Sequence, residues 1–177
     1  MAVGAYDPKT IEPSVMKFWE REQVQDKARK QNSGRKKFYF LDGPPYTSGT
    51  VHIGTAWNKA MKDFVLRYKR MRGFDVWDRA GYDMHGLPTE GKIRQKNKLF
   101  LKKDIEAFGI EKYNKECENF AVDMMHQMSR TFERLGVWMD FDNSYIPISR
   151  EFIEGEWWLI KRAHEQGRLY EGLRTMP

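Results

Sequence analysis

Apolar side chains recur every three or four residues along several stretches of the chain, which is the period of a helix with one buried face. Pro13 suits the first turn of the earliest stretch, and Ser149 can cap the last one. Gly73 and Gly167 stand where two of the helices should end, because glycine adopts the left-handed conformation that closes many helices. A further helix should begin near Pro88. The predicted helices are residues 10–31, 54–72, 110–135 and 149–166.

The apolar positions also predict the buried face of each helix. Lys59 and Lys62 could contact a phosphate, but they are expected on a solvated helix face. Trp157 and Trp158 are expected to pack in the core rather than to stack on bases. In the helix 54–72 the predicted buried positions are Ala56, Ala60, Phe64, Val65 and Tyr68. In the helix 110–135 they are Tyr113, Cys117, Phe120, Met124, Met128, Phe132 and Leu135.

Two short runs rich in aromatic residues predict strands on either side of the helix 54–72. The run 37–41 is expected to be a buried strand, and the Asp42-Gly43-Pro44-Pro45 stretch ends it, because proline cannot donate to a sheet ladder. A second strand begins at 74–77, and 168–174 has the pattern of another strand beginning. Strand, helix and strand in this order make a βαβ crossover, the unit of a parallel sheet. The sequence therefore predicts an α/β fold.

Length, charge and cysteine content limit the classes of protein to consider. The chain has 177 residues, of which 31 are basic and 25 acidic, and the net charge of +6 suits an anionic partner such as a nucleotide or RNA. Cys117 is the single cysteine, which excludes an internal disulfide framework and a cysteine-built zinc site. No apolar run approaches the ~18 residues of a membrane span. The N-terminus also lacks a secretory signal, so we expect a cytoplasmic protein with no membrane segment.

The stretch TSGTVHIGTAWNK, residues 47–59, joins the first strand to its helix and is the first candidate site. This loop lies at the carboxyl edge of the predicted sheet, where open α/β folds bind ligands. A helix N-terminus offers unpaired N–H groups and about half a positive charge, both of which favour phosphate. Gly49 and Gly54 let a ligand approach the backbone, and the His52 ring can donate to a phosphate oxygen. The loop is not a Walker A motif, because Gly43 and Gly49 have the wrong spacing and Thr50 replaces the lysine.

Two motifs in register resemble the class I aminoacyl-tRNA synthetases. His52-Ile53-Gly54-Thr55 occupies the place of the H-I-G-H element, about thirty residues before the segment GYDMHGLPTE, residues 81–90. That segment matches the G-[WFY]-D-x-H-G-L-P-x-E pattern of the isoleucine-specific enzymes, whereas valine enzymes usually carry G-T-D-H-A-G and leucine enzymes G-W-D-A-F-G-L-P. The helix around Trp19 and the segment FERLGVWMDF, residues 132–141, also resemble the family. The resemblance thus covers nearly the whole chain.

This resemblance implies a single partial domain over residues 1–177, with an N-terminal helical extension at 1–36. Residues 37–177 would form the first half of a Rossmann-like, nucleotide-binding parallel sheet with additional long helices. The implied reaction is activation of isoleucine by ATP, with Mg²⁺ accompanying the ATP, and then transfer of the acyl group to tRNA(Ile). The family's K-M-S-K-S element, its editing insertion and its anticodon-binding helices appear nowhere in these residues. Activity is therefore expected of a complete chain, which the resemblance implies to be a monomer.

The same resemblance implies roles for individual residues. His52 and Thr55 are the catalytic candidates, and Gly49, His52, Gly54 and Thr55 would contact ATP. Asp83 would face the ammonium group of the substrate, with the backbone of Pro44 and Pro45 lining the amino-acid pocket. His85 is expected to support the loop rather than to take part in the chemistry. No metal site is expected within the chain itself.

One position departs from the family pattern, and it leaves other functions open. Thr55 stands where the class usually has a second histidine, and a threonine hydroxyl can donate a hydrogen bond but cannot carry positive charge. The alternatives are a valine or leucine enzyme of the same class, a small nucleotidyltransferase with an H-x-G-H-like loop, and a nucleotide- or tRNA-binding module without catalysis.

Overall fold

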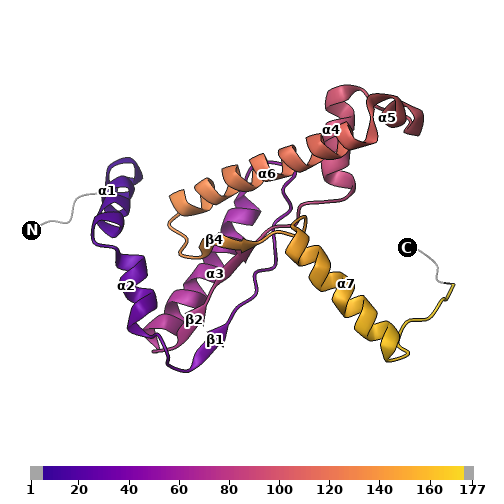
Figure 1. The fold of residues 1–177 in the computed structure, drawn as a ribbon. Coiled ribbons are helices and arrows are strands. Elements are labelled where there is room, and N and C mark those ends of the chain that lie inside the picture. Colours follow the sequence, from indigo (N-terminus) through magenta and orange to yellow (C-terminus); the bar gives the residue numbers. More distant parts are fainter. Residues whose placement is uncertain (1–5, 174–177) are drawn as a thin grey trace, which may run out of the picture.

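In the computed structural model, which describes residues 6–173, short parallel strands lie between helices of very different lengths (Figure 1). The elements in chain order are α1 (Pro8–Arg21), α2 (Val24–Gln31), β1 (Lys37–Tyr39), α3 (Ile53–Met71), β2 (Asp75–Trp77), β3 (Arg79–Gly81), α4 (Leu87–Asn97), α5 (Lys102–Phe108), α6 (Ile110–Arg134), β4 (Asp140–Tyr145) and α7 (Arg150–Glu165).

The strands confirm the predicted parallel crossover. β1 pairs in parallel with β2, Phe38 lying opposite Val76, and α3 connects the two strands. β3 pairs in parallel with β4, Gly81 lying opposite Tyr145. Only Asp78 separates β2 from β3. The stretch 75–81 therefore pairs with β1 over residues 75–77 and with β4 over residues 79–81. The strand β4 was not predicted.

The predicted strand 37–41 is present but is not buried. β1 ends at Tyr39, although the N–H of Phe40 still donates to the carbonyl of Trp77 at 3.0 Å. Tyr39 and Leu41 are 72% and 70% exposed. Within the described residues β1 pairs with β2 alone, so its other edge has no strand beside it.

The single helix predicted for residues 10–31 is two helices. Gln23 adopts the left-handed conformation with φ of 49°, which ends the helical path and turns the chain into α2. The first helix also begins earlier than predicted, because Asp7 caps it by accepting from the N–H of Lys9 at 3.1 Å. Pro13 therefore lies inside α1 rather than in its first turn.

The core gathers on one face of α6, as the helical period predicted. Met128 and Phe132 are buried there and pack with Leu66 of α3, with Tyr82 after β3 and with Met139 before β4. Met125 is buried more fully than Met124, and Leu135 is exposed, which are the two departures from the predicted stripe. A second, smaller cluster of Ile93, Leu99 and Tyr113 joins α4 to α6.

The buried face of α3 is the opposite of the predicted one. Phe64, Val65 and Tyr68 are exposed, and Ala60 is exposed as well. The residues that α3 buries are Lys59, Asp63, Leu66 and Arg70. Three of these four are charged, and each finds an ion-pair partner nearby, so an apolar pattern alone could not identify this face.

Two further predictions, for the helix α7 and for residues 168–174, are corrected by the structure. α7 extends away from the other elements at the lower right of Figure 1 and buries none of its residues, so Trp157 and Trp158 are 66% and 56% exposed rather than packed in a core. Residues 168–173 contain no strand, and Arg174, the end of the predicted strand, lies outside the described residues. No helix in the described part of the chain is both long enough and apolar enough to cross a bilayer.

Candidate adenylate-forming site

His52 is the N-cap of α3. Its backbone is extended, with φ of −98° and ψ of 169°, and its Nδ1 accepts from the N–H of Thr55 at 3.3 Å. A neutral ring that accepts at Nδ1 carries its proton on Nε2, which lies 3.0 Å from the Thr55 hydroxyl. The ring is exposed, and the first N–H groups of a 19-residue helix lie beside it. The sequence brings an imidazole and a helix N-terminus together at one accessible point.

Two glycines flank this cap, and they serve different purposes. A β-carbon at position 54 would lie 3.1 Å from Cε1 and 3.2 Å from Nδ1 of His52, so glycine there lets the ring fold back over the helix start. A β-carbon at position 49 would meet nothing within 4 Å, and Gly49 does not have a positive φ. Packing thus explains Gly54, whereas the chain beside Gly49 is open to the outside.

The loop before His52 lies against the segment that contains Asp83. The N–H of Asp83 donates to the carbonyl of Pro45 at 2.9 Å, and the N–H of Thr47 donates to the carbonyl of Asp83 at 2.9 Å. The Thr47 hydroxyl donates to the same carbonyl at 3.2 Å, and Thr47 is fully buried. Tyr46 and Asp83 form an isolated parallel bridge that extends the strand pairing. The loop that leads to His52 and the Asp83 segment, which stand more than thirty residues apart in the sequence, therefore meet at one edge of the sheet.

The residues predicted to line the amino-acid pocket are accessible. Pro44 is exposed and Pro45 is partly buried, and the carboxylate of Asp83 is also partly buried. Among the described residues this carboxylate has no ion-pair or hydrogen-bond partner, which leaves it able to receive a cation. His85 lies differently: its carbonyl accepts from the Tyr46 hydroxyl at 2.5 Å, while its ring is exposed.

His85 lines a cavity of about 700 Å³ between α4, α5, α6 and the start of α7. Tyr113 and Cys117 line the same cavity from α6, and burial raises the pKa of both groups, that of Tyr113 to about 12. Neither His52 nor Asp83 reaches this cavity. The contact of His85 with the loop is made by its main-chain carbonyl, which accepts from the Tyr46 hydroxyl.

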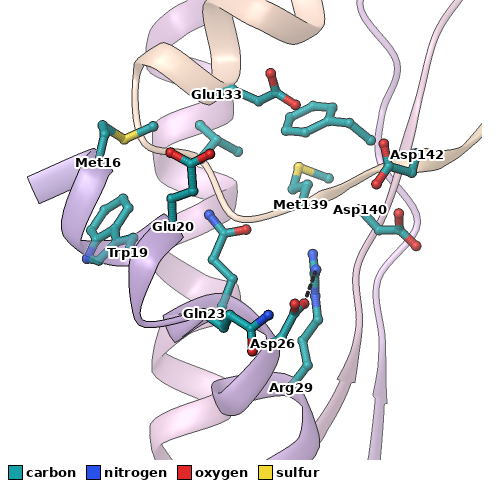
Figure 2. A pocket seen from close by; sticks show the side chains of 13 residues that line it. Met16, Trp19, Glu20, Gln23, Asp26, Arg29, Glu133, Met139, Asp140 and Asp142 are labelled. Carbon is teal, nitrogen blue, oxygen red and sulfur yellow. Dashed lines mark ion pairs between the residues drawn. The ribbon is translucent and has the colours of Figure 1, made fainter. Parts of the chain in front are cut away.

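A second cavity, of about 520 Å³, lies between α1 and α2 on one side and the end of α6 and β4 on the other (Figure 2). Glu20 and Asp26 stand on one wall, and Asp26 pairs with Arg29 at 3.9 Å. Glu133 stands on the other wall, where burial and the Asp142 carboxylate raise the pKa of Glu133. No residue predicted for the site lines this cavity, so the candidate site is the open loop edge near His52 and Asp83.

Lys59 and Lys62 do not lie where the sequence suggested. Lys59 is 1% exposed and pairs with Asp42, which is buried as well. Lys62 pairs with the same carboxylate at 2.8 Å and donates to the carbonyl of Gly43 at 2.8 Å. Sequence reasoning missed Asp42, and the available signal was the pair of lysines seven and ten residues after His52, on the turns that face the end of β1.

Comparison with known proteins decides the family. The family model for class I tRNA synthetases (I, L, M and V) matches residues 14–177. The chain belongs to the class I tRNA synthetases. Curated relatives named isoleucine–tRNA ligase include one from Methanothrix thermoacetophila, 49% identical over 173 residues, and one from Pyrococcus abyssi, 46% identical over 172 residues. The resemblance predicted from the two motifs is confirmed.

A solved class I synthetase has the same fold. The crystal structure of the ternary complex of Agrobacterium radiobacter K84 agnB2 LeuRS-tRNA-LeuAMS matches 92% of this chain and 18% of that one, with a TM-score of 0.66 and 26% sequence identity. The two relatives above are matched over 98% and 97% of this chain, yet each match covers 16% of the relative. The chain thus spans about a sixth of the length of these synthetases.

Within this synthetase chain, the residues described contain no group of three or more histidine, cysteine or acidic side chains that could hold a metal ion. The described loop does contain donors suited to an anion: the Thr55 hydroxyl, the His52 ring and the first N–H groups of α3.

Proposed function

We propose that residues 1–177 form the first part of a longer isoleucine–tRNA ligase and carry one half of its adenylate-forming site. In this division residues 1–36 are an N-terminal helical extension, and residues 37–177 are the first half of the Rossmann-like domain. The observation that carries the proposal is the set of backbone bonds joining Asp83 to Pro45 and Thr47, because they bring the loop that leads to His52 and the Asp83 segment to one edge of the sheet. The similarity to the isoleucine–tRNA ligases supports the choice of amino acid.

ATP would bind where α3 begins. The macrodipole of a 19-residue helix and its free N–H groups favour the phosphates at that end. His52 and the Thr55 hydroxyl would donate to phosphate oxygens, while Gly54 leaves room for the adenine to approach the backbone. The open side of Gly49 gives the triphosphate a second close approach to the main chain.

Isoleucine would bind beside Asp83. Its ammonium group would pair with the accessible carboxylate, and the backbone at Pro44 and Pro45 would border the side chain. Because the Tyr46 hydroxyl donates to the carbonyl of His85 at 2.5 Å, His85 would hold this loop in place without joining the chemistry.

The chemistry follows from this placement. A carboxylate oxygen of isoleucine attacks the α-phosphorus of ATP, a new P–O bond forms, and the bond to pyrophosphate breaks, so that pyrophosphate leaves with the electron pair. Negative charge grows on the phosphate oxygens in the transition state, and positioned donors such as His52 are worth most at that moment. The acyl group then passes to the terminal ribose of tRNA(Ile), and AMP leaves.

Other components would come from outside these residues. Mg²⁺ would arrive with ATP, and the tRNA-binding and editing parts of the enzyme would lie in the rest of a monomeric, cytoplasmic protein. We refer to that longer polypeptide as the full-length enzyme.

The proposal is tested by ATP–pyrophosphate exchange with the full-length enzyme and isoleucine, valine, leucine or methionine in parallel. We expect the highest kcat/KM with isoleucine, and we expect His52→Ala to lower kcat about 10²–10³-fold, since one donor to a developing charge is removed. Exchange that depends on valine or leucine more strongly than on isoleucine would assign the chain to another enzyme of the class. Exchange with none of the four amino acids would contradict an adenylate-forming role.

A further inference from the structure

A fully buried carboxylate stands at the start of the loop that contains His52. Asp42 follows β1, and its side chain has no exposed surface. Its Oδ2 meets the ammonium group of Lys59 and also accepts from the N–H of Gly81 at 3.3 Å. Its Oδ1 accepts from Lys62 at 2.8 Å. Three polar contacts thus converge on two carboxylate oxygen atoms that have no exposed surface.

These contacts join most elements of the candidate site. Lys59 and Lys62 belong to α3, Gly81 ends β3, and the Tyr145 hydroxyl at the end of β4 donates to the main-chain carbonyl of Asp42 at 2.5 Å. Lys59 Nζ also lies 5.0 Å from the centre of the Phe132 ring of α6. Asp42 is therefore the point where two strands, the crossover helix and the end of β1 are connected.

The residues that contact Asp42 lie close in sequence to both parts of the proposed site, the start of α3 at His52 and the Asp83 segment. Asp42 begins the loop that ends at His52, and Gly81 stands two residues before Asp83. Lys59 lies seven residues after His52, which is two turns or about 10 Å along the helix. Any shift of this carboxylate would move the start of α3 relative to Asp83.

Stability alone does not account for these charges. Burial lowers the pKa of Lys59, and the neighbouring Asp42 carboxylate opposes that effect. A buried ion pair commonly contributes no more to stability than a well-packed neutral pair of similar size, whereas removal of one partner alone is strongly destabilising. Unlike a neutral pair, the ion pair fixes the position of α3 relative to the chain segment that follows β1, because its two charged groups must stay in contact.

We propose that Asp42 and Lys59, assisted by Lys62, are positioning residues that fix the distance between the phosphate-binding start of α3 and the Asp83 segment. This inference rests on the proposed adenylate chemistry. The cluster touches neither substrate, and it acts by holding the carboxylate of isoleucine in line with the α-phosphorus. A displacement of about 1 Å at a reacting centre can lower a rate about 10²-fold.

The test uses the full-length enzyme and three variants, Asp42→Asn, Lys59→Met and the double variant that combines them. Asp42→Asn leaves the buried Lys59 ammonium group without its partner, and Lys59→Met leaves the buried carboxylate with Lys62 alone. We therefore expect a lower Tm and a lower kcat for isoleucine-dependent exchange in each single variant. The double variant removes both charges, so we expect its Tm to return toward the wild-type value. Its kcat per active site should nevertheless stay about 10²-fold low, while KM for isoleucine and for ATP changes much less.

A matched control is available on the same helix. Arg70 of α3 and Asp78 form a second buried ion pair, each side chain 6% exposed, at the end of α3 away from His52. The double variant Arg70→Met with Asp78→Asn tests whether loss of any buried pair lowers kcat. We expect it to change Tm and to leave kcat and both KM values at the wild-type level.

The outcomes separate this inference from the proposed function. A double variant of Asp42 and Lys59 that folds and exchanges at the wild-type rate would show that the cluster is structural only and would overturn the inference. If that double variant does not fold, Lys62→Met decides, because Lys62 is partly exposed and its loss should lower kcat without lowering Tm. An unchanged kcat in Lys62→Met would then overturn the inference. Absence of isoleucine-dependent exchange in the unmutated enzyme would instead contradict the proposed function, and the positioning role would fall with it.

Discussion

His52 has two tasks at one helix turn, since the ring that would donate to phosphate also caps α3. Its Nδ1 accepts from the N–H of Thr55, and the Thr55 hydroxyl lies 3.0 Å from Nε2. The main-chain N–H of Thr55 thereby leaves the proton of a neutral ring on Nε2, which faces the Thr55 hydroxyl, and that hydroxyl can in turn donate to a phosphate. The departure from the family pattern is thus compatible with a donor at this position.

Gly54→Ala tests whether the ring needs its folded-back position. The added β-carbon would lie 3.1 Å from the His52 ring, so we expect the imidazole to be displaced and kcat for exchange in the full-length enzyme to fall about 10–10²-fold. Gly155→Ala is the control, because a β-carbon there, inside α7, meets nothing within 4 Å. It should leave kcat unchanged and raise stability by about 0.5–1 kcal/mol. Equal kcat values in the two variants would refute a role for the geometry of the ring.

Asp83→Asn tests the proposed ammonium partner. The amide keeps the shape of the side chain but removes its charge, so we expect KM for isoleucine to rise about 10–100-fold, the equivalent of one hydrogen bond to a charged group. KM for ATP should change little. Steady-state exchange with each substrate varied in turn gives both values, and an effect confined to ATP would contradict the assignment.

The helix α3 shows where local sequence patterns fail. Its exposed apolar stripe has the period of a buried face, while the face toward the sheet carries charged residues. The partners that make this burial possible are distant in sequence: Lys59 meets Asp42, which is 17 residues away, and Asp63 accepts from the N–H of Trp138, which is 75 residues away. A helical period describes one helix, whereas the burial of a charge depends on groups that only the folded chain brings near.

Two helix ends with local signals were predicted correctly. Ser149 caps α7 by accepting from the N–H of Phe152 at 3.3 Å, and Gly73, with φ of 85°, follows the end of α3, as both residues predicted. β4 was missed because its sequence, DFDNSY, is polar and becomes a strand through pairing with β3. The same contrast holds at the site. The two motifs could be identified from the sequence, whereas the buried ion pairs of Asp42 form only in the folded chain and could not.

Gly81→Ala tests the close contact between β3 and β4. A β-carbon at this position would overlap the aromatic ring of Tyr145, whose hydroxyl holds the carbonyl of Asp42. We expect the free energy of unfolding of the full-length enzyme to fall by about 1–3 kcal/mol, as for other overpacked core sites. Gly91→Ala, where nothing lies within 4 Å, is the control, and chemical denaturation compares the two. Equal stabilities would show that the strands can separate without loss.

Several faces of the described chain present apolar side chains to solvent. On α3 these are Ile53, Trp57, Met61, Phe64, Val65, Tyr68 and Met71, and on α7 they are Ile153, Trp157, Trp158, Leu159 and Ile160. The edge of β1 away from β2 has no partner strand within the described residues. Surfaces of this kind are usually covered by other parts of a protein, and the isoleucine–tRNA ligases that match this chain are about six times as long.

We therefore expect the isolated 177 residues to be much less stable than the same segment within the full-length enzyme. The isolated chain should bind a hydrophobic dye, should melt with low cooperativity and should support no isoleucine-dependent exchange. Calorimetry and dye binding on both proteins, at equal molar concentration, make the comparison. A cooperative transition together with exchange at the full-length rate would contradict this expectation.

The most direct measurement is a crystal structure of the full-length enzyme with a non-hydrolysable analogue of isoleucyl-adenylate. We predict that the phosphate replacement lies at the N-terminus of α3, within hydrogen-bond distance of His52. We also predict that the ammonium group of the analogue lies within about 4 Å of the Asp83 carboxylate, as an ion pair requires. An analogue bound elsewhere, or bound with its ammonium group away from Asp83, would contradict the account.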